Sequence, residues 1–304
     1  MTRISLTTAA LLLSAVLLGS ATLAAEEEAS RVRILLVIHT NGEVEGKECG
    51  FAVDGQSVRE VIETNLKKQR LENRYTLDVL TGDDVTAAKV LGYYRTLKTS
   101  PDEALVFFYS GHGILNSNHE HVMTMNGRSL RRTELLMSMA RHDPRLMVVL
   151  SSSCANVPGE AVKNDPARAS SAETSNADTS SDTSSDDATR STAPAAVRPG
   201  DGTALRHLFF RQQGVVDINA ARVAEYGWGH PELGGTFFTV ALTQLLGGTV
   251  KRLDRNQDDF VEWHEFYAAL RSRTAQIAGS HGNEQNTMAY TLPAPTRATT
   301  VAAK

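Results

Sequence analysis

Short apolar runs separated by polar stretches divide the chain into alternating strand-like and helix-like segments. Several runs are continuous and rich in β-branched side chains, as expected of strands buried on both faces of a parallel sheet. Others alternate between apolar and polar positions, which is the period of a half-buried strand. The predicted strands are Val32–Ile38, Tyr75–Leu80, Ala104–Tyr109, Leu146–Leu150, Gly214–Asn219 and Met288–Leu292.

Helical spacing of apolar residues marks the segments between these strands. In the first of them Val58, Ile62 and Leu66 fall on one side, and Asp54 can cap its start. The predicted helices are Asp54–Lys68, Asp84–Leu97, Leu130–Ala140, a segment that follows Thr236 as its N-cap, and Glu262–Ile277. Strands that alternate with helices form mainly parallel sheets. We therefore predict a three-layer α/β fold with about six strands and helices on both faces.

Two segments have neither period. Residues 1–25 contain one Arg, a short apolar run and then small residues, which is the order of a secretory signal peptide. An uncleaved anchor is the alternative, although the run is too short to cross a bilayer. Residues 159–202 are mostly Ser, Thr, Ala and Asp, and so predict a disordered linker. We expect an exported protein that resides in the periplasm or outside the cell.

Composition and charge narrow the function classes. The 304 residues include 31 Lys and Arg against 35 Asp and Glu, for a net charge of -4. Without a basic excess, nucleic acid is not an expected partner. After the N-terminal run no segment has the roughly 20 apolar residues of a membrane span. Two cysteines are too few for a disulfide scaffold or a cysteine-based zinc site.

Reactive residue types follow two of the predicted buried strands. Ala104–Tyr109 leads into Ser-Gly-His112-Gly113, and Leu146–Leu150 leads into Ser-Ser-Ser-Cys154. Ligands of open parallel sheets bind at the carboxyl ends of the strands. If the two strands are neighbours, an imidazole and a thiol emerge together, and this pair suits acyl transfer. Taken singly, Cys154 is better explained as a buried small residue and His112 as a turn residue.

The order of FFYSGHG, MVVLSSSC, a disordered linker and GGTFFTVALTQLL resembles the caspase and metacaspase family of cysteine peptidases, here as a secreted bacterial member. The resemblance implies the caspase-like α/β fold, a peptide or protein substrate and no cofactor for the chemistry. It implies His112 as general base and acid and Cys154 as nucleophile. The amides of Gly113 and Cys154 would be the oxyanion donors.

The resemblance also divides the chain. Residues 26–158 correspond to the large subunit, 159–202 to the linker between subunits and 203–292 to the small subunit, with a disordered tail at 293–304. An exposed flexible linker is easily cleaved. Basic residues within or beside it make self-cleavage a coherent hypothesis, against a spacer that is never cut. These residues are Lys163, Arg168, Arg190 and Arg198.

A substrate pocket is implied by the same resemblance. In metacaspases an acid that opens the first helix, the Ser of SGHG and an Asp two positions before the catalytic Cys surround the residue before the scissile bond. Asp54, Ser110 and Ser152 occupy these positions here. One acid is kept and one is replaced, which predicts a weak preference for Arg or Lys. The alternative role of Asp54 is a simple helix cap.

Residues 254–265 have the ligand spacing of an EF-hand loop. Positions 1, 3, 5, 7, 9 and 12 are Asp254, Asn256, Asp258, Phe260 through its carbonyl, Glu262 and Glu265. Position 6 is Asp259 instead of Gly, so backbone strain of about 1 kcal/mol is expected there. Calcium is thus the one candidate cofactor. The alternative is a polar loop that opens a helix.

The remaining candidates are weaker. We expect both Cys49 and Cys154 to be thiols, because a bridge between them would block the proposed nucleophile. His39, His119 and His121 could bind a metal ion, but the latter two are better explained by a solvated loop. Two other functions remain open: a catalytically silent caspase-like binding module and a calcium-responsive interaction protein. The oligomeric state is not indicated.

Overall fold

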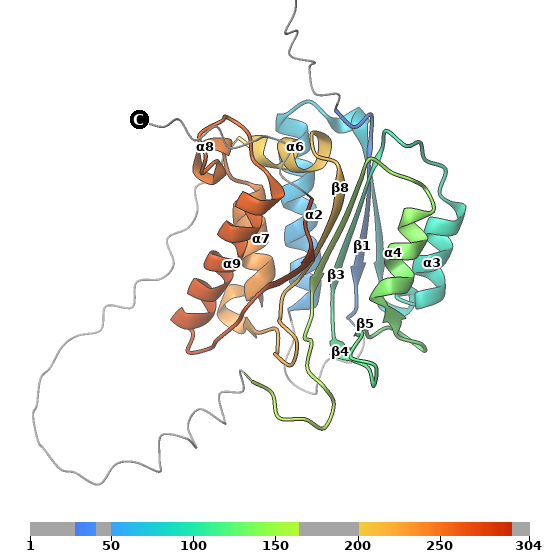
Figure 1. Cartoon of the computed structure of the whole chain (residues 1–304), viewed down its shortest axis with the longest axis vertical. Coiled ribbons are helices and arrows are strands. Elements are labelled where there is room, and N and C mark those ends of the chain that lie inside the picture. The colour runs from blue at the N-terminus through green and yellow to red at the C-terminus, as the bar shows by residue number, and fades with distance from the viewer. Residues whose placement is uncertain (1–27, 41–49, 164–200, 294–304) are drawn as a thin grey trace, which may run out of the picture.

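A computed structural model describes residues 28–40, 50–163 and 201–293, and these build an α/β fold around one six-stranded sheet (Figure 1). The strands lie in the order β11-β8-β7-β3-β1-β2, and all neighbours are parallel except β11 and β8. Their bounds are Val32–Ile38 (β1), Tyr75–Thr81 (β2), Ala104–Ser110 (β3), Leu146–Ser152 (β7), Gly214–Asn219 (β8) and Met288–Thr291 (β11). The predicted fold class is confirmed.

Strand burial follows the sequence patterns. Every residue of β3 and β7 is buried, as their continuous apolar runs predict for the middle of a covered sheet. The edge strand β2 is partly exposed, which accounts for its alternating pattern. Successive residues of β1 enter opposite cores: Ile34 and Leu36 pack on one face, and Leu35 and Val37 on the other.

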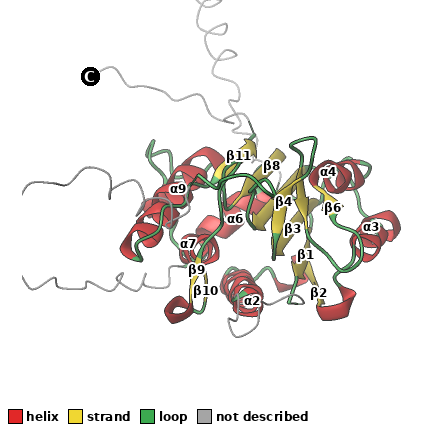
Figure 2. Cartoon of the chain, turned by 90° about the horizontal axis from the view of Figure 1, so that it is seen from below, coloured by secondary structure: helices red, strands yellow, loops and turns green. Residues whose placement is uncertain are grey.

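Helices cover both faces of the sheet (Figure 2). One face carries α3 (Ala87–Thr96) and α4 (Arg132–Ala140). The other face carries α2 (Phe51–Lys68), α6 (Thr203–Phe210), α7 (Phe237–Leu246), α8 (Val250–Leu253) and α9 (Trp263–Ser280). This second layer holds the larger core cluster, which includes the buried Trp263, Phe209 and Phe237.

Two small sheets are separate from the main one. The first contains β4 (Gly113–Leu115), β5 (His121–Met123) and β6 (Leu130–Arg131), and the second is a hairpin of β9 (Gly229–His230) and β10 (Gly235–Thr236). Single 3-10 turns complete the described elements: Glu72–Arg74, Gly82–Asp84 and Pro231–Leu233. The sequence patterns predict neither small sheet nor α6, because the strands have only two or three residues and the helix only eight.

Several helix starts differ from the prediction. The helix predicted from Leu130 begins at Arg132, because Leu130–Arg131 forms β6, and α9 begins at Trp263 with Glu262 as its N-cap. The first helix begins at Phe51, after Gly50 in the left-handed conformation with φ 71°, and not at Asp54. The helix predicted from Asp84 begins at Ala87, because the side chain of Thr86 accepts a hydrogen bond from the Lys89 amide. The predicted Thr236 cap of α7 is confirmed by its bond from the Thr239 amide.

Several predictions fall outside the described residues. These are the signal peptide at 1–25, Cys49, positions 164–200 of the linker and the tail from residue 294. In the part of the chain that the structure describes, no helix is both long and apolar enough to cross a bilayer.

Candidate active site

The register of the central strands brings the two candidate catalytic residues to the same edge of the sheet. β3 and β7 are parallel neighbours, and Ser110 pairs with Ser152. His112 and Cys154 each follow two residues beyond this pair. The two segments remain hydrogen-bonded past the strand ends, because the Gly111 amide donates to the Ser152 carbonyl at 3.2 Å. The sequence prediction of a shared sheet edge therefore agrees with the backbone geometry.

Gly113 lies against the Cys154 main chain. A Cβ atom at Gly113 would be 2.7 Å from the Cys154 carbonyl oxygen and 2.9 Å from Ser153 Cβ. Such contacts are too short, so only glycine lets the two loops approach in this way. This close approach places the Gly113 backbone beside the cysteine, where the resemblance requires an oxyanion donor.

His112 is held from two sides. Its carbonyl oxygen accepts hydrogen bonds from the Tyr109 hydroxyl at 2.8 Å and from the Thr124 amide at 2.9 Å. Its ring packs edge-on against Phe51, with 5.1 Å between ring centroids. The ring of His39 is also edge-on to that of His112, with 6.5 Å between their centroids. The backbone and ring contacts together fix where the imidazole stands at the sheet edge.

The Cys154 sulfur meets a segment that sequence reasoning missed. The Gly227 amide donates a hydrogen bond to the sulfur at 3.3 Å, and Cys154 is partly exposed. A main-chain N–H is a donor that a thiolate can use. Cys154 is a thiol in the structure, but Cys49 lies outside the described residues, so the expectation for both cysteines remains a prediction.

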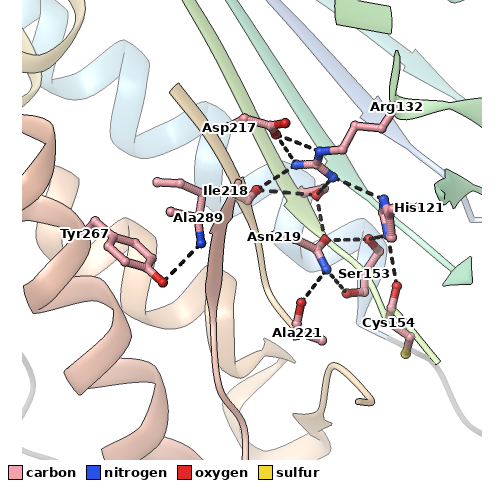
Figure 3. A network of polar contacts seen from close by, with 11 residues as sticks. His121, Arg132, Ser153, Cys154, Asp217, Ile218, Asn219, Ala221, Tyr267 and Ala289 are labelled. Carbon is pink, nitrogen blue, oxygen red and sulfur yellow. Dashed lines mark hydrogen bonds and ion pairs between the residues drawn. The ribbon is translucent and has the colours of Figure 1, made fainter. Parts of the chain in front are cut away.

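A buried polar network lies behind the cysteine (Figure 3). Arg132, at the start of α4, donates to the Asp217 carboxylate of β8 at 2.7 Å, and both side chains are buried. The same guanidinium donates to Ser151 Oγ at 2.8 Å, to His121 Nδ1 at 3.1 Å and to the Ile218 carbonyl at 3.2 Å. One cation thus connects β5, β7 and β8.

His121 joins this network to the cysteine. Because Nδ1 accepts from Arg132, Nε2 carries the ring proton and donates to the Cys154 carbonyl at 3.0 Å. Burial, followed by the charge of Arg132, lowers the pKa of His121 to about 3. The expectation that His121 belongs to a solvated loop is therefore wrong, since the residue is buried and neutral at physiological pH.

Asn219 holds the serines that precede the cysteine. Its Oδ1 accepts from Ser151 Oγ at 2.6 Å and from Ser153 Oγ at 2.9 Å, and its Nδ2 donates to the Ser153 carbonyl at 3.2 Å. These bonds fix the strand end from which Cys154 projects. The sequence contains one signal for the network, because Asp217 is a charged residue within a buried strand and requires a partner.

The three predicted pocket residues meet around Asp54. Its carboxylate accepts hydrogen bonds from Ser110 Oγ at 2.6 Å and from Thr236 Oγ1 and the Thr236 amide, each at 2.9 Å. Ser152 Oγ lies 2.6 Å from Thr236 Oγ1 and so joins the group indirectly. Asp54 is not a helix cap, contrary to that alternative, because α2 has already begun and the side chain points to these hydroxyls.

Asp54 is a buried carboxylate for which the described residues supply no cation. It is 1% exposed, and burial raises its pKa to about 6 despite the three hydrogen bonds. The carboxylate is therefore ionised at neutral pH but held at an energetic cost. Thr236, which sequence reasoning identified only as a helix cap, is its main partner.

The β9–β10 hairpin connects the pocket and the cysteine. Gly227, which precedes β9, touches the sulfur, and Thr236 of β10 binds Asp54. Gly235 fits only as glycine, since a Cβ there would be 2.6 Å from Asp54 Oδ1. The run of four glycines in YGWGHPELGG was the available sequence signal for this close approach.

The EF-hand-like loop folds around its own backbone amides. The Asp254 carboxylate accepts from the amides of Gln257, Asp258 and Asp259, and the Glu265 carboxylate accepts from that of Arg255. Asp259 has φ 59°, so the position that lacks glycine is indeed in the left-handed region.

The predicted calcium ligands lie along this loop, and the acidic ones are not gathered around one point. Among the described residues, no three of the acidic ligands of the loop lie within 4.8 Å of one another. The entering helix α8 has only four residues. Calcium binding at Asp254, Asn256, Asp258, Phe260, Glu262 and Glu265 stays a prediction.

His39 and His119 do not join His121 in a metal site among the described residues. His39 follows β1, is buried and contacts Asn126 Oδ1 at 3.4 Å, and burial lowers its pKa. Lys163, the one described basic residue of the predicted linker, is exposed, and its amide donates to the Ala224 carbonyl at 3.0 Å.

Comparison with known proteins finds a likeness of fold. No protein-family model matches the chain, and no curated protein sequence matches it. The crystal structure of caspase-1 from Spodoptera frugiperda is similar, with a TM-score of 0.53, 12% sequence identity, and coverage of 87% of this chain and 90% of that chain. At this identity the likeness establishes the fold alone, and the fold of this chain is caspase-like.

Proposed function

We propose that this chain is an exported cysteine endopeptidase in which Cys154 and His112 form the catalytic dyad. One observation carries the proposal: two adjacent buried strands end in register, and each is followed two residues later by one member of the pair. A caspase-like fold around that edge is consistent with it. The protein-level partner is then a peptide or protein chain bound along the sheet edge.

In the proposed reaction, His112 takes the thiol proton and the Cys154 thiolate attacks the scissile carbonyl carbon, which forms a C–S bond. The amides of Gly113 and Cys154 donate to the oxyanion. The His112 imidazolium then protonates the leaving amine as the C–N bond breaks. Water, deprotonated by His112, hydrolyses the thioester and releases the acid and the thiol.

The Asp54 pocket supports a preference for a basic residue before the cut. A buried carboxylate without a cation is stabilised when a substrate guanidinium or ammonium group enters beside it. Ser110, Ser152 and Thr236 offer only hydroxyl groups there. With one acid where metacaspases have two, the proposed preference is weak.

Hydrolysis of a positional peptide library by the purified chain tests the proposal. We expect cleavage after Arg and Lys, no cleavage by Cys154→Ala or His112→Ala, and unchanged cleavage by His264→Ala, which alters an exposed histidine of α9. Cleavage that persists in Cys154→Ala would contradict the proposed catalytic dyad. Intact masses of wild type and Cys154→Ala after incubation test self-cleavage, which requires the wild-type mass alone to fall.

A second candidate is a catalytically silent binding module. The contact of Gly227 with the Cys154 sulfur favours it, because the oxygen and amide of this glycine occupy space beside the nucleophile. A peptide that binds to wild type and to Cys154→Ala with equal affinity, and that neither protein cleaves, would support this alternative.

A further inference from the structure

A histidine and glutamate cluster lies at the outer end of the β9–β10 hairpin. His230 ends β9, Glu232 follows it in the connecting turn, and His281 follows the last residue of α9. One ligand atom from each side chain lies within 4.8 Å of the others. In residues 28–40, 50–163 and 201–293 this is the one group of three or more histidine, cysteine or acidic ligands that is so close together.

His281 is already oriented for metal binding. Its Nδ1 lies 2.9 Å from the Ile277 carbonyl oxygen, to which the ring N–H donates, and 3.1 Å from Ser280 Oγ. With the proton on Nδ1, Nε2 has its lone pair available. A histidine ligand held by a carbonyl through its other nitrogen is the usual arrangement in metal sites. Packing against Phe237, with ring centroids 5.4 Å apart, further restricts the ring.

His230 and Glu232 form the other side of the cluster. The two histidine rings are 4.6 Å apart between centroids. The Glu232 amide contacts His230 Nδ1 at 3.3 Å, which keeps both residues in one tight turn. Because Nδ1 accepts from this amide, the ring proton of His230 is on Nε2. Binding of a metal ion through Nε2 would move the proton to Nδ1, and only the 3.3 Å hydrogen bond from the Glu232 amide would be lost. Both histidines are half-buried and Glu232 is exposed, so an ion can enter from solvent.

We propose that His230, Glu232 and His281 bind a divalent transition metal ion of the zinc type. Two imidazole nitrogens and one carboxylate oxygen are a donor set that zinc accepts, and three protein ligands leave a fourth position for water or a substrate group. Calcium and magnesium prefer oxygen ligands throughout, so this site is chemically distinct from the loop at 254–265. The inference does not depend on the proposed peptidase activity.

The ion would join two elements that are already in contact. Trp228 of the hairpin donates its amide to Gln285 Oε1, in the loop after α9, at 2.7 Å. The hairpin reaches Cys154 through Gly227 and Asp54 through Thr236. Figure 2 shows β9 and β10 beside α7 and α2. A metal ion at its outer end would therefore clamp the hairpin that forms one wall of the candidate active site.

Zinc titration of the full-length chain without an affinity tag tests this site. The Cys154→Ala background removes the nucleophilic sulfur as a ligand. We expect calorimetry to detect one zinc ion per chain, cobalt to give the visible absorption of a nitrogen and oxygen site, and zinc at 100 times its Kd to raise the melting temperature by about 5 °C. In the same background His281→Ala and His230→Ala should weaken binding at least about 100-fold, and Glu232→Gln about tenfold.

His264→Ala is the matched control, since His264 is an exposed histidine near the opposite end of α9. It should bind zinc as its parent does. Glu232→Gln alters an exposed turn residue, so it reports on binding even if a histidine variant fails to fold. Zinc binding that survives both Glu232→Gln and His281→Ala unchanged, or no binding to the parent at millimolar zinc, would overturn the proposal.

Discussion

Asp217 and Asp54 are both buried, at 2% and 1% exposure, but the fold treats them differently. Asp217 has Arg132 at 2.7 Å. Asp54 has only hydroxyls and an amide within the described residues, and burial raises its pKa to about 6. A compensated charge serves the architecture of the sheet edge, whereas an uncompensated one is costly unless a ligand completes it. This difference supports the proposal that a cationic substrate group binds beside Asp54.

Breaking the buried Arg132–Asp217 pair should give the largest loss of stability. Arg132→Met leaves the Asp217 carboxylate buried without a cation, so we expect the free energy of unfolding to fall by about 3–5 kcal/mol. Denaturant unfolding followed by circular dichroism measures this. Arg59→Met, which breaks the exposed pair with Glu63, should cost under about 0.5 kcal/mol. Equal stability of Arg132→Met and wild type would show that the network is not structural.

At the uncompensated site the effect should appear in specificity. Asp54→Asn removes the charge that a substrate guanidinium would meet. We expect the ratio of kcat/KM for an arginine peptide to that for its neutral citrulline analogue to fall about tenfold, while the citrulline value changes little. Asp102→Asn, an exposed acid before the amino end of β3, is the control. A ratio near one in wild type would mean that Asp54 does not face the substrate.

The same ratio should depend on pH through Asp54. Its pKa of about 6 lies above the ordinary value of 3.8, so the site loses its charge as the pH falls below about 6. Because both substrates use one dyad, the dyad's titration cancels in the ratio. We expect the arginine preference to be full above pH 7, to decline toward pH 5, and to be flat in Asp54→Asn.

The free energy of unfolding should depend on the same titration, but it should fall with rising pH where the arginine preference rises. The folded state binds the Asp54 proton more tightly than the unfolded state, so this group lowers the free energy of unfolding as the pH rises from about 4 to about 6. Relative to wild type, Asp54→Asn should therefore gain stability over that interval. A parallel pH dependence of the two proteins would contradict the raised pKa.

The smallest effect is expected at a third group of carboxylates, in the 254–265 loop, where amides rather than a cation satisfy the acids. Calcium at millimolar concentration should raise the melting temperature by only a few degrees, because the loop is already ordered by its own hydrogen bonds. Glu265→Gln should remove the shift. Calorimetry without any heat at millimolar calcium would exclude the site.

Which features can be predicted from the sequence depends on how far apart in the chain the interacting residues lie. β1, β3 and β7 were predictable because both of their faces are buried and only apolar residues satisfy that. The edge shared by His112 and Cys154 followed from parallel topology. Asp54 was identified through the family resemblance, since the local pattern equally suggested a cap.

Other features depend on contacts between distant segments. α6 has eight residues directly after the low-complexity linker, so the helical spacing of Leu205, Leu208 and Phe209 is too short a signal to predict it. The hairpin strands have two residues each. Arg132 and Asp217 are 85 positions apart, and only the anomaly of an acid in a buried strand indicated that a partner exists. Thr236 doubles as a cap and as the partner of Asp54, and only its cap role is local.

Covalent trapping tests the central claim most directly. A peptidyl electrophile that ends in arginine should add once to wild type, at Cys154 by peptide mapping, and not at all to Cys154→Ala. His112→Ala should react at least about 100-fold more slowly, because the thiol then lacks its base. Labelling that is equally fast without His112, or that falls on Cys49 alone, would contradict a dyad at the shared edge of β3 and β7.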